Sequence, residues 1–155
     1  MPVEIRVAAP ADREAILALV PRLRAFGPAP LRPPEAMDAA EREALAAALD
    51  APRDDATLLV AAAAGLPVAG FALAHEAADY FTRETHGHLA IFAVAADAEG
   101  RGVGRALLGA VEAWSAARGH RFLTLNVFAA NARARAVYER AGYAPDTVRY
   151  LKLLA

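Results

Sequence analysis

Apolar residues alternate with polar ones at the start of the chain and then recur at helical spacing. Val3, Ile5 and Val7 fall on one face of an extended segment, which predicts a strand over residues 3–7. The next apolar residues recur every three or four positions, which predicts a helix over residues 11–26. A proline-rich stretch at 26–34 ends this helix, and an alanine-rich run predicts a second helix over 35–49.

The rest of the chain alternates short apolar runs with amphipathic ones. The strands predicted over 57–63 and 68–75 form a hairpin through the turn at 65–67. Residues 78–87 form a loop. A helix joins the strands at 88–94 and 121–128, so we expect these two strands to be parallel with a right-handed crossover. The order of elements predicts one mixed α/β domain over residues 1–155. The pattern predicts strands over 57–63, 68–75, 88–94, 121–128 and 147–153, and helices over 103–118 and 131–141.

A glycine-rich turn lies between the strand at 88–94 and the helix at 103–118. Glycines leave the backbone N–H groups accessible, and the helix dipole adds positive charge at the same point. The turn therefore predicts a binding site for an anion, such as the phosphate of a ligand. It reads Glu99-Gly100-Arg101-Gly102-Val103-Gly104-Arg105.

The composition narrows the classes of protein that the chain can belong to. Its 155 residues, of which 57% are hydrophobic, suit one domain with a sizeable core and argue against disorder. The lack of cysteine excludes disulfides, thiolate catalysis and cysteine-ligated metals. No apolar run reaches the length of a membrane span, and residues 1–6 lack the layout of a signal peptide. We therefore expect a cytoplasmic protein without a membrane partner.

The net charge of −1 is unevenly divided along the chain. Residues 1–100 hold 8 arginines and 15 acidic residues, whereas residues 101–155 hold 9 basic and 3 acidic residues. The basic half contains most of the glycine turn, which would attract a polyphosphate, although ordinary solvated helix faces explain the asymmetry equally well. Basic and aromatic residues are not interleaved, so no nucleic-acid partner is expected.

Two common classes of glycine loop conflict with the residues here. A nucleoside-triphosphate loop needs Lys and then Ser or Thr after its last glycine, but Gly104 is followed by Arg105 and Ala106. A dinucleotide-binding loop needs a third glycine where this chain has Leu107. That class also needs an acid at the end of the next strand, which offers only residues 125–127, Leu-Asn-Val.

Residues 92–143 resemble the GNAT superfamily of acyl-CoA-dependent N-acetyltransferases. The family loop, Q/R-x-x-G-x-G/A, corresponds to the turn from Glu99 to Gly104, with Glu99 in place of the usual Gln or Arg. The order of elements also agrees with the GNAT fold. That fold has a mixed, mostly antiparallel sheet with a parallel pair at the cofactor site and helices on both faces. A second family motif, N-x-x-A-x-x-x-Y-x-x-x-G-F, is matched by Asn131, Ala134, Tyr138, Gly142 and Tyr143.

The resemblance implies that the loop holds the pyrophosphate of acetyl-CoA (coenzyme A) through backbone amides. It also implies that Phe92 and Val94 present backbone groups to the pantetheine arm, and that an N–H near Val94 polarises the acetyl carbonyl. Asn131 either hydrogen-bonds the cofactor arm or caps the helix that follows it. The implied cofactor-binding residues are Phe92, Val94, Glu99, Gly100, Arg101, Gly102, Val103, Gly104, Arg105, Asn131 and Tyr138.

The resemblance also suggests a general acid. Tyr138 corresponds to the family residue that protonates the departing thiolate, and a phenol remains protonated at neutral pH. The alternative is a core tyrosine on an amphipathic helix. The spacing of Tyr138 from Asn131 and Gly142 is that of the family motif, which favours the catalytic interpretation.

The general base is harder to identify, because Ala90 and Ile91 hold the positions of the usual strand acid. Strand alternation would place His88 on the face of Phe92 and Val94, and the pKa of a histidine suits a base at neutral pH. His88 is therefore the candidate base, the alternative being a surface histidine. No metal site is expected. Rival bases in the preceding loop are Asp79, Glu84 and His86.

The resemblance therefore implies an N-acetyltransferase that moves an acetyl group from acetyl-CoA to a primary amine by direct attack. The acceptor would be a small molecule or a peptide, and a homodimer is compatible with the resemblance. The alternative is a non-catalytic acyl-CoA-binding sensor or partner module. The family layout implies that the acceptor lies between segments 26–37 and 79–86, lined by Phe26, Leu31, Met37, Tyr80 and Phe81.

Overall fold

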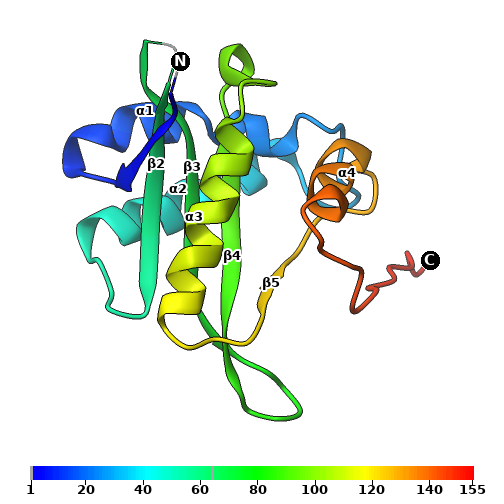
Figure 1. Ribbon diagram of the computed structural model, residues 1–155. Helices are drawn as coiled ribbons and strands as arrows, with labels where there is room; N and C mark the ends of the chain where they lie inside the picture. Colours follow the sequence, from blue (N-terminus) through cyan, green and yellow to red (C-terminus); the bar gives the residue numbers. More distant parts are fainter. Residues whose placement is uncertain (1, 64) are drawn as a thin grey trace.

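A computed structural model describes residues 2–63 and 65–155, and within them five strands form one sheet (Figure 1). Neighbouring strands are antiparallel except the last pair, which is parallel. The expected mixed sheet with one parallel pair is thus confirmed. The strands lie side by side in chain order: β1 (Glu4–Val7), β2 (Ala56–Ala63), β3 (Leu66–Ala78), β4 (Thr85–Val94) and β5 (Leu123–Leu125).

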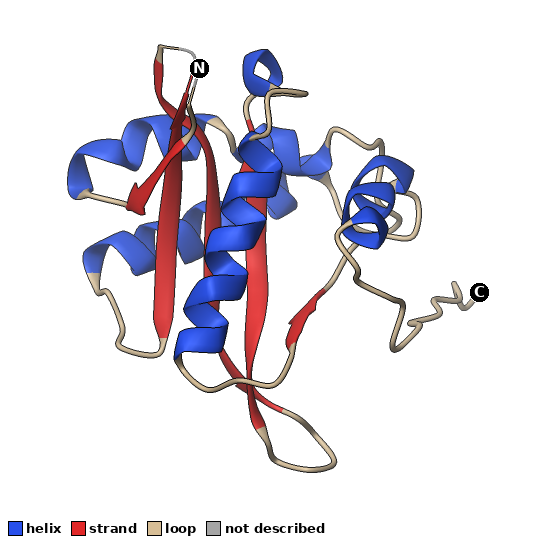
Figure 2. Ribbon diagram, viewed as in Figure 1, coloured by secondary structure: helices blue, strands red, loops and turns tan. Residues whose placement is uncertain are grey.

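Helices cover both faces of this sheet (Figure 2). The longest helices of the two faces, α3 and α2, belong to separate hydrophobic cores. One face carries α3 (Val103–Ala117), and the other carries α1 (Arg13–Ala18), the 3-10 helix η2 (Val20–Arg24) and α2 (Pro34–Asp50). The remaining elements are the short 3-10 turns η1 (Pro10–Asp12) and η3 (Ala96–Ala98), and α4 (Ala132–Arg140), which lies beyond β5.

Small residues let α3 lie close to the sheet. A Cβ on Gly70 of β3 would lie 2.8 Å from the Ala93 carbonyl oxygen and 3.0 Å from the Leu107 side chain. No larger residue fits there without displacing β4 or α3. On the opposite face, Ile16 and Phe71 are fully buried between the sheet and the helices α1 and α2. The sheet is therefore fixed between two packed layers.

The helix predicted over 11–26 is interrupted. The α-helical part, α1, ends at Ala18, and the chain continues as the 3-10 helix η2. Pro21 explains the change, because it has no N–H to donate and its ring excludes the carbonyl one turn earlier. The predicted helix over 35–49 is confirmed as α2, within one residue at each end.

The prediction of a strand over 147–153 is wrong. The strand predicted over 121–128 is present but shorter, as β5. After Leu125 the chain leaves the sheet, and its last residues extend away from the molecule beyond α4 (Figure 1). Val148, Tyr150 and Leu151 are exposed there. Strand-forming residues adopt a strand only against a paired edge, and no strand of the described residues pairs with this segment.

The loop predicted over 78–87 is shorter than expected. Strand β3 runs to Ala78 and β4 begins at Thr85, so only residues 79–84 form the turn. The Asp79 carboxylate closes it by accepting the backbone N–H of Phe81 at 3.0 Å and that of Thr82 at 2.8 Å. No helix of the described residues is long and apolar enough to cross a membrane.

Candidate active site

A cavity of about 1430 Å³ opens where β4 and β5 separate. The two strands pair only between Gly87–Leu89 and Leu123–Leu125, so the second half of β4 is free on this side. The walls of the cavity come from this half of β4, from the glycine loop with the first turns of α3, from residues 125–128, and from α4. The C-terminal end of η2, the two residues after it and one residue of α2 complete the cavity from the other face of the sheet.

The backbone of β4 faces this cavity. The Ala95 N–H donates to the Ala69 carbonyl at 2.8 Å, and hydrogen bonds alternate along an antiparallel pair. Val94 and Phe92 therefore turn their N–H and C=O groups away from β3 and towards the gap. The Arg22 guanidinium donates its Nε–H to the Val94 carbonyl at 3.3 Å, which leaves the N–H of Val94 directed into the gap.

The glycine loop ends in a row of free donors. Gly100 and Gly102 have left-handed φ angles of 71° and 81°, which glycine adopts without the strain that a side chain brings. Within the described residues, the backbone N–H groups of residues 100–105 have no hydrogen-bond acceptor; the first helical bond runs from Ala106 to Gly102. Apart from the adjacent residues of the chain, no described residue has an atom within 4 Å of a Cβ built on Gly100 or Gly102. The loop thus presents unpaired donors to open space at a helix N-terminus, which suits a pyrophosphate.

Gly104 has a different role from the two loop glycines. Its φ is not positive, and a Cβ there would contact the Phe92 ring at 3.5 Å and the Val94 side chain at 3.6 Å. The first turn of α3 therefore lies directly against the cavity side of β4. Phe92 and Val94 contact the core on the α3 face.

Glu99 joins three elements rather than pointing at an anion. Its carboxylate pairs with Arg22 of η2 and, at 2.8 Å, with Arg133 of α4. The hydrogen bond from Arg133 and the charges of both arginines hold the pKa of Glu99 below its usual range. The negative charge that departs from the family motif is therefore neutralised by two cations at the edge of the cavity.

Asn131 and Tyr138 both line the cavity from α4. The Asn131 side-chain oxygen accepts the Ala134 N–H at 3.2 Å, so the residue caps α4. Its amide NH₂ group is not used by that bond. Tyr138 is partly buried near Phe92, with ring centroids 6.3 Å apart, and burial raises the pKa of its phenol. Its hydroxyl makes no hydrogen bond to the described residues, which leaves it as a donor for a ligand.

A β-bulge changes the face on which His88 lies. Leu73 is opposite Ile91 and Ala74 is opposite Leu89, so Ala90 is an extra residue in β4. The expectation that His88 shares a face with Phe92 and Val94 is therefore wrong, because the bulge reverses the alternation between them.

His88 lies instead on the α2 face, outside the residues that line the cavity. Its Nδ1 is 2.8 Å from the Thr124 hydroxyl, and its ring lies 5.3 Å from that of His75. Burial, and then the charges of His75 and His86, lowers its pKa. No group of three metal-binding side chains occurs in the described part of the chain.

Most of the predicted cofactor residues meet at the cavity, but four of the five expected acceptor residues do not. Ten of the eleven line it, the exception being the exposed Arg101. Of the residues expected around the acceptor, Phe26 lines the cavity, stacked on Phe128 with centroids 5.0 Å apart. Tyr80 and Phe81 are wrong as lining residues, because the longer β3 and β4 carry them out into solvent. Leu31 and Met37 do not line it either.

The sequence analysis did not identify a carboxylate that α2 brings to the cavity. Glu41 of α2 lines the same cavity, although its segment shows only an alanine-rich amphipathic helix in the sequence. The rival general bases expected in the 79–86 segment do not line this cavity. Asp79 closes its own turn, and Glu84 pairs with Arg121 at 2.6 Å. Helical periodicity could have placed Glu41 on the inner face, but not at a particular cavity.

Comparisons with known proteins agree with this geometry. A protein from Pyrococcus furiosus assigned as an acetyl transferase superposes with a TM-score of 0.77 at 21% identity, covering 99% of this chain and 100% of that chain. The aminoglycoside N-acetyltransferase AAC(6')-Iy, in complex with CoA, gives a TM-score of 0.71 at 23% identity, covering 99% and 96%. A ribosomal-protein-alanine N-acetyltransferase from Brucella melitensis biovar Abortus 2308 gives 0.70 at 21% identity, covering 99% and 100%. These likenesses establish the fold.

The sequence itself identifies the family. No curated protein sequence matches the chain. The profile of the Acetyltransferase (GNAT) family, however, matches residues 23–143, a span that runs from the end of η2 through the glycine loop to the end of the second motif. Because that span covers most of the chain and holds all the cavity-lining residues except Arg22, this protein belongs to the GNAT family of acetyltransferases.

Proposed function

We propose that this protein is an N-acetyltransferase that transfers the acetyl group of acetyl-CoA to a primary amine by direct attack. The observation that carries the proposal is the row of unpaired N–H groups at residues 100–105, which borders the same cavity as the Tyr138 hydroxyl. An anion-binding end and a proton donor in one cavity suit a ligand that carries both a pyrophosphate and a thioester. The chain has no cysteine to serve as an acyl carrier, which favours direct transfer.

Different residues of the cavity would bind different parts of acetyl-CoA. The loop N–H groups and Arg105 would hold the pyrophosphate, and Arg101 would add charge from outside. The backbone groups of Phe92 and Val94, together with the free amide NH₂ of Asn131, would hold the pantetheine arm. Bound acetyl-CoA supplies an electrophilic thioester carbonyl. The Val94 N–H would donate to its oxygen as negative charge develops there.

Proton transfer follows from the same arrangement. The amine nitrogen forms a bond to the acetyl carbon, the bond from that carbon to sulfur breaks, and the sulfur takes the proton of the Tyr138 hydroxyl. The amine must give up one proton to a base for the charges to balance. His88 remains a prediction for that base, and its position on the α2 face requires an intervening water. Its lowered pKa keeps it unprotonated at neutral pH.

The acceptor class and the assembly remain predictions. Solved neighbours include enzymes named for aminoglycosides and for the alanine of a ribosomal protein, so both small-molecule and peptide amines belong in a screen. A cytoplasmic location and a homodimer are compatible with the chain and need their own measurements. The missing strand acid at Ala90 and Ile91 favours one alternative, a non-catalytic acyl-CoA-binding module.

Calorimetric titration with acetyl-CoA, and separately with NADH and ATP, tests the proposal. We expect micromolar binding of acetyl-CoA and none of NADH. The bound protein should then release free thiol in the presence of a panel of primary amines and peptides. Absence of acetyl-CoA binding would refute the cofactor site. Tight binding without release of thiol from any amine would favour the non-catalytic alternative.

A further inference from the structure

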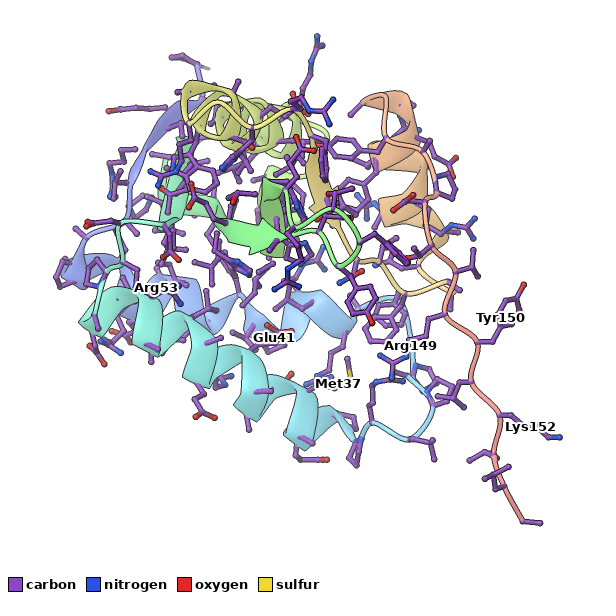
Figure 3. All side chains as sticks on the ribbon, turned by 90° about the horizontal axis from the view of Figure 1, so that it is seen from below. Met37, Glu41, Arg53, Arg149, Tyr150 and Lys152 are labelled. Carbon is purple, nitrogen blue, oxygen red and sulfur yellow. The ribbon has the colours of Figure 1, made fainter. Side chains whose placement is uncertain are left out.

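Glu41 is a carboxylate in the cavity that the proposed function leaves without a role. It lies in the middle of α2, and Figure 3 shows its side chain on the side of the helix that faces η2 and the sheet. It borders the cavity together with Leu23 and Phe26, on the opposite side of β4 from the glycine loop. The residue is half-buried, so its charge is only partly solvated.

No counter-ion of Glu41 occurs among the described residues. It has no ion pair or hydrogen bond there, although arginines lie on the elements packed against α2. Strand β2 contributes no ionisable side chain, and Glu14 of α1 is exposed. Each of the arginines is already paired with a different acid: Arg22 with Glu99, Arg24 with Asp38, and Arg13 with Asp50.

Burial without a partner has a measurable consequence. Loss of hydration raises the pKa of Glu41, and no nearby cation offsets this effect. A half-buried carboxylate of this kind is stabilised by any cation that enters the cavity. The cavity wall beside it is apolar, with Leu23 and Phe26, so the expected occupant joins a positive charge to an apolar group.

We infer that Glu41 binds the acceptor amine as its ammonium ion and then takes the proton that the amine loses. This inference rests on the proposed acetyl transfer and assigns the general base to Glu41, which lines the cavity, in place of His88, which does not. One N–H proton moves to a carboxylate oxygen of Glu41, directly or through one water, and the nitrogen lone pair forms the bond to the acetyl carbon. The bond to sulfur breaks, and Tyr138 protonates the sulfur. The second proton that the nitrogen loses as the amide forms returns to the Tyr138 oxygen, directly or through water, and restores the phenol. Glu41 thus takes the role that the family gives to a strand acid, which is absent at Ala90 and Ile91.

The test compares Glu41→Gln with Glu43→Gln. Both changes remove one carboxylate from α2, but Glu43 is exposed and outside the cavity. We expect Glu41→Gln to lower kcat/KM for primary amines about 10²-fold while acetyl-CoA affinity stays unchanged. Glu43→Gln should match the native protein.

The pH profile gives a second kinetic test. Native kcat/KM should fall as the pH drops through the raised pKa of Glu41, because the protonated carboxyl accepts no proton. This acidic limb should be absent from the profile of Glu41→Gln.

A second measurement does not depend on turnover. With CoA bound, the native protein should bind benzylamine more tightly than benzyl alcohol, since the two differ in charge but hardly in shape. Glu41→Gln should lose that preference, whereas Glu43→Gln should keep it. Equal binding of both compounds by the native protein, or native kinetics in Glu41→Gln, would overturn the role of Glu41. Failure of acetyl-CoA to bind the native protein would instead overturn the proposed function, so the two failures are distinct.

Discussion

Single side chains in this cavity have their chemistry set by what surrounds them. Tyr138 is partly buried and has no protein partner for its hydroxyl among the described residues, so burial alone raises its pKa. Tyr143, whose ring lies 6.0 Å away, donates its hydroxyl to Glu112 at 3.0 Å. Two neighbouring tyrosines therefore differ in one respect that matters for catalysis: only the first has a proton free for a ligand.

This difference predicts that removing the hydroxyl group lowers turnover at Tyr138 but not at Tyr143. Tyr138→Phe should lower kcat about 10²-fold, because the departing sulfur loses its proton donor, and should leave the Kd for acetyl-CoA within about twofold of the native value. Tyr143→Phe removes an equivalent hydroxyl from the adjacent ring and should keep native turnover. Steady-state kinetics with calorimetry on both variants measures this. Native kcat in Tyr138→Phe would show that another group protonates the sulfur.

At the scale of elements, helix α3 has a glycine in the same backbone conformation at each end. Gly102 precedes its first turn and Gly119 follows its last, both with φ of 81°, and no described atom lies within 4 Å of a Cβ on either. Alanine at either position should therefore destabilise the protein by a similar amount, about 1 kcal/mol, from backbone strain alone. Only Gly102 borders the cavity.

The pair of glycines separates folding from binding. Gly102→Ala should weaken acetyl-CoA binding at least about tenfold, because its methyl group enters the space above the free N–H groups. Gly119→Ala should bind like the native protein. Urea denaturation and calorimetric titration of both variants give the two quantities. Native affinity in a folded Gly102→Ala would remove the loop from the cofactor site.

The elements also mark where sequence reasoning works and where it stops. Local signals predicted the glycine turn, its helix and the hairpin, because glycine conformation and side-chain periodicity are properties of neighbouring residues. The bulge at Ala90 could not be predicted from the sequence, because it arises from the pairing of β4 with β3. It places His88 on the opposite face of the sheet from the one expected. The strand expected at 147–153 failed because a strand needs a paired edge. Glu41 was missed because η2 and α2, not the motif, bring it to the cavity.

At the scale of the whole molecule, folding rearranges the charge asymmetry of the sequence. Acids of the first hundred residues pair with arginines of the remainder, which neutralises three of the nine basic residues of that half locally. Arg101 and Arg105, beside the free N–H groups, have no acidic partner among the described residues. Two of the unpaired cations therefore adjoin the anion-binding loop. The pairs that cross between the two halves are Glu76 with Arg118, Glu84 with Arg121, and Glu99 with Arg133.

This arrangement predicts that salt weakens the binding of the whole cofactor but not of its uncharged arm. Raising NaCl from about 0.02 M to about 0.5 M shortens the range of the attraction from Arg101 and Arg105, so the Kd for acetyl-CoA should rise about tenfold. S-acetylpantetheine, which carries the thioester arm without phosphates, should bind weakly and equally at both salt concentrations. Calorimetry across the salt series measures both ligands. An acetyl-CoA affinity that does not change with salt would mean that the backbone N–H groups alone hold the pyrophosphate, and that the two arginines face solvent without contributing to binding.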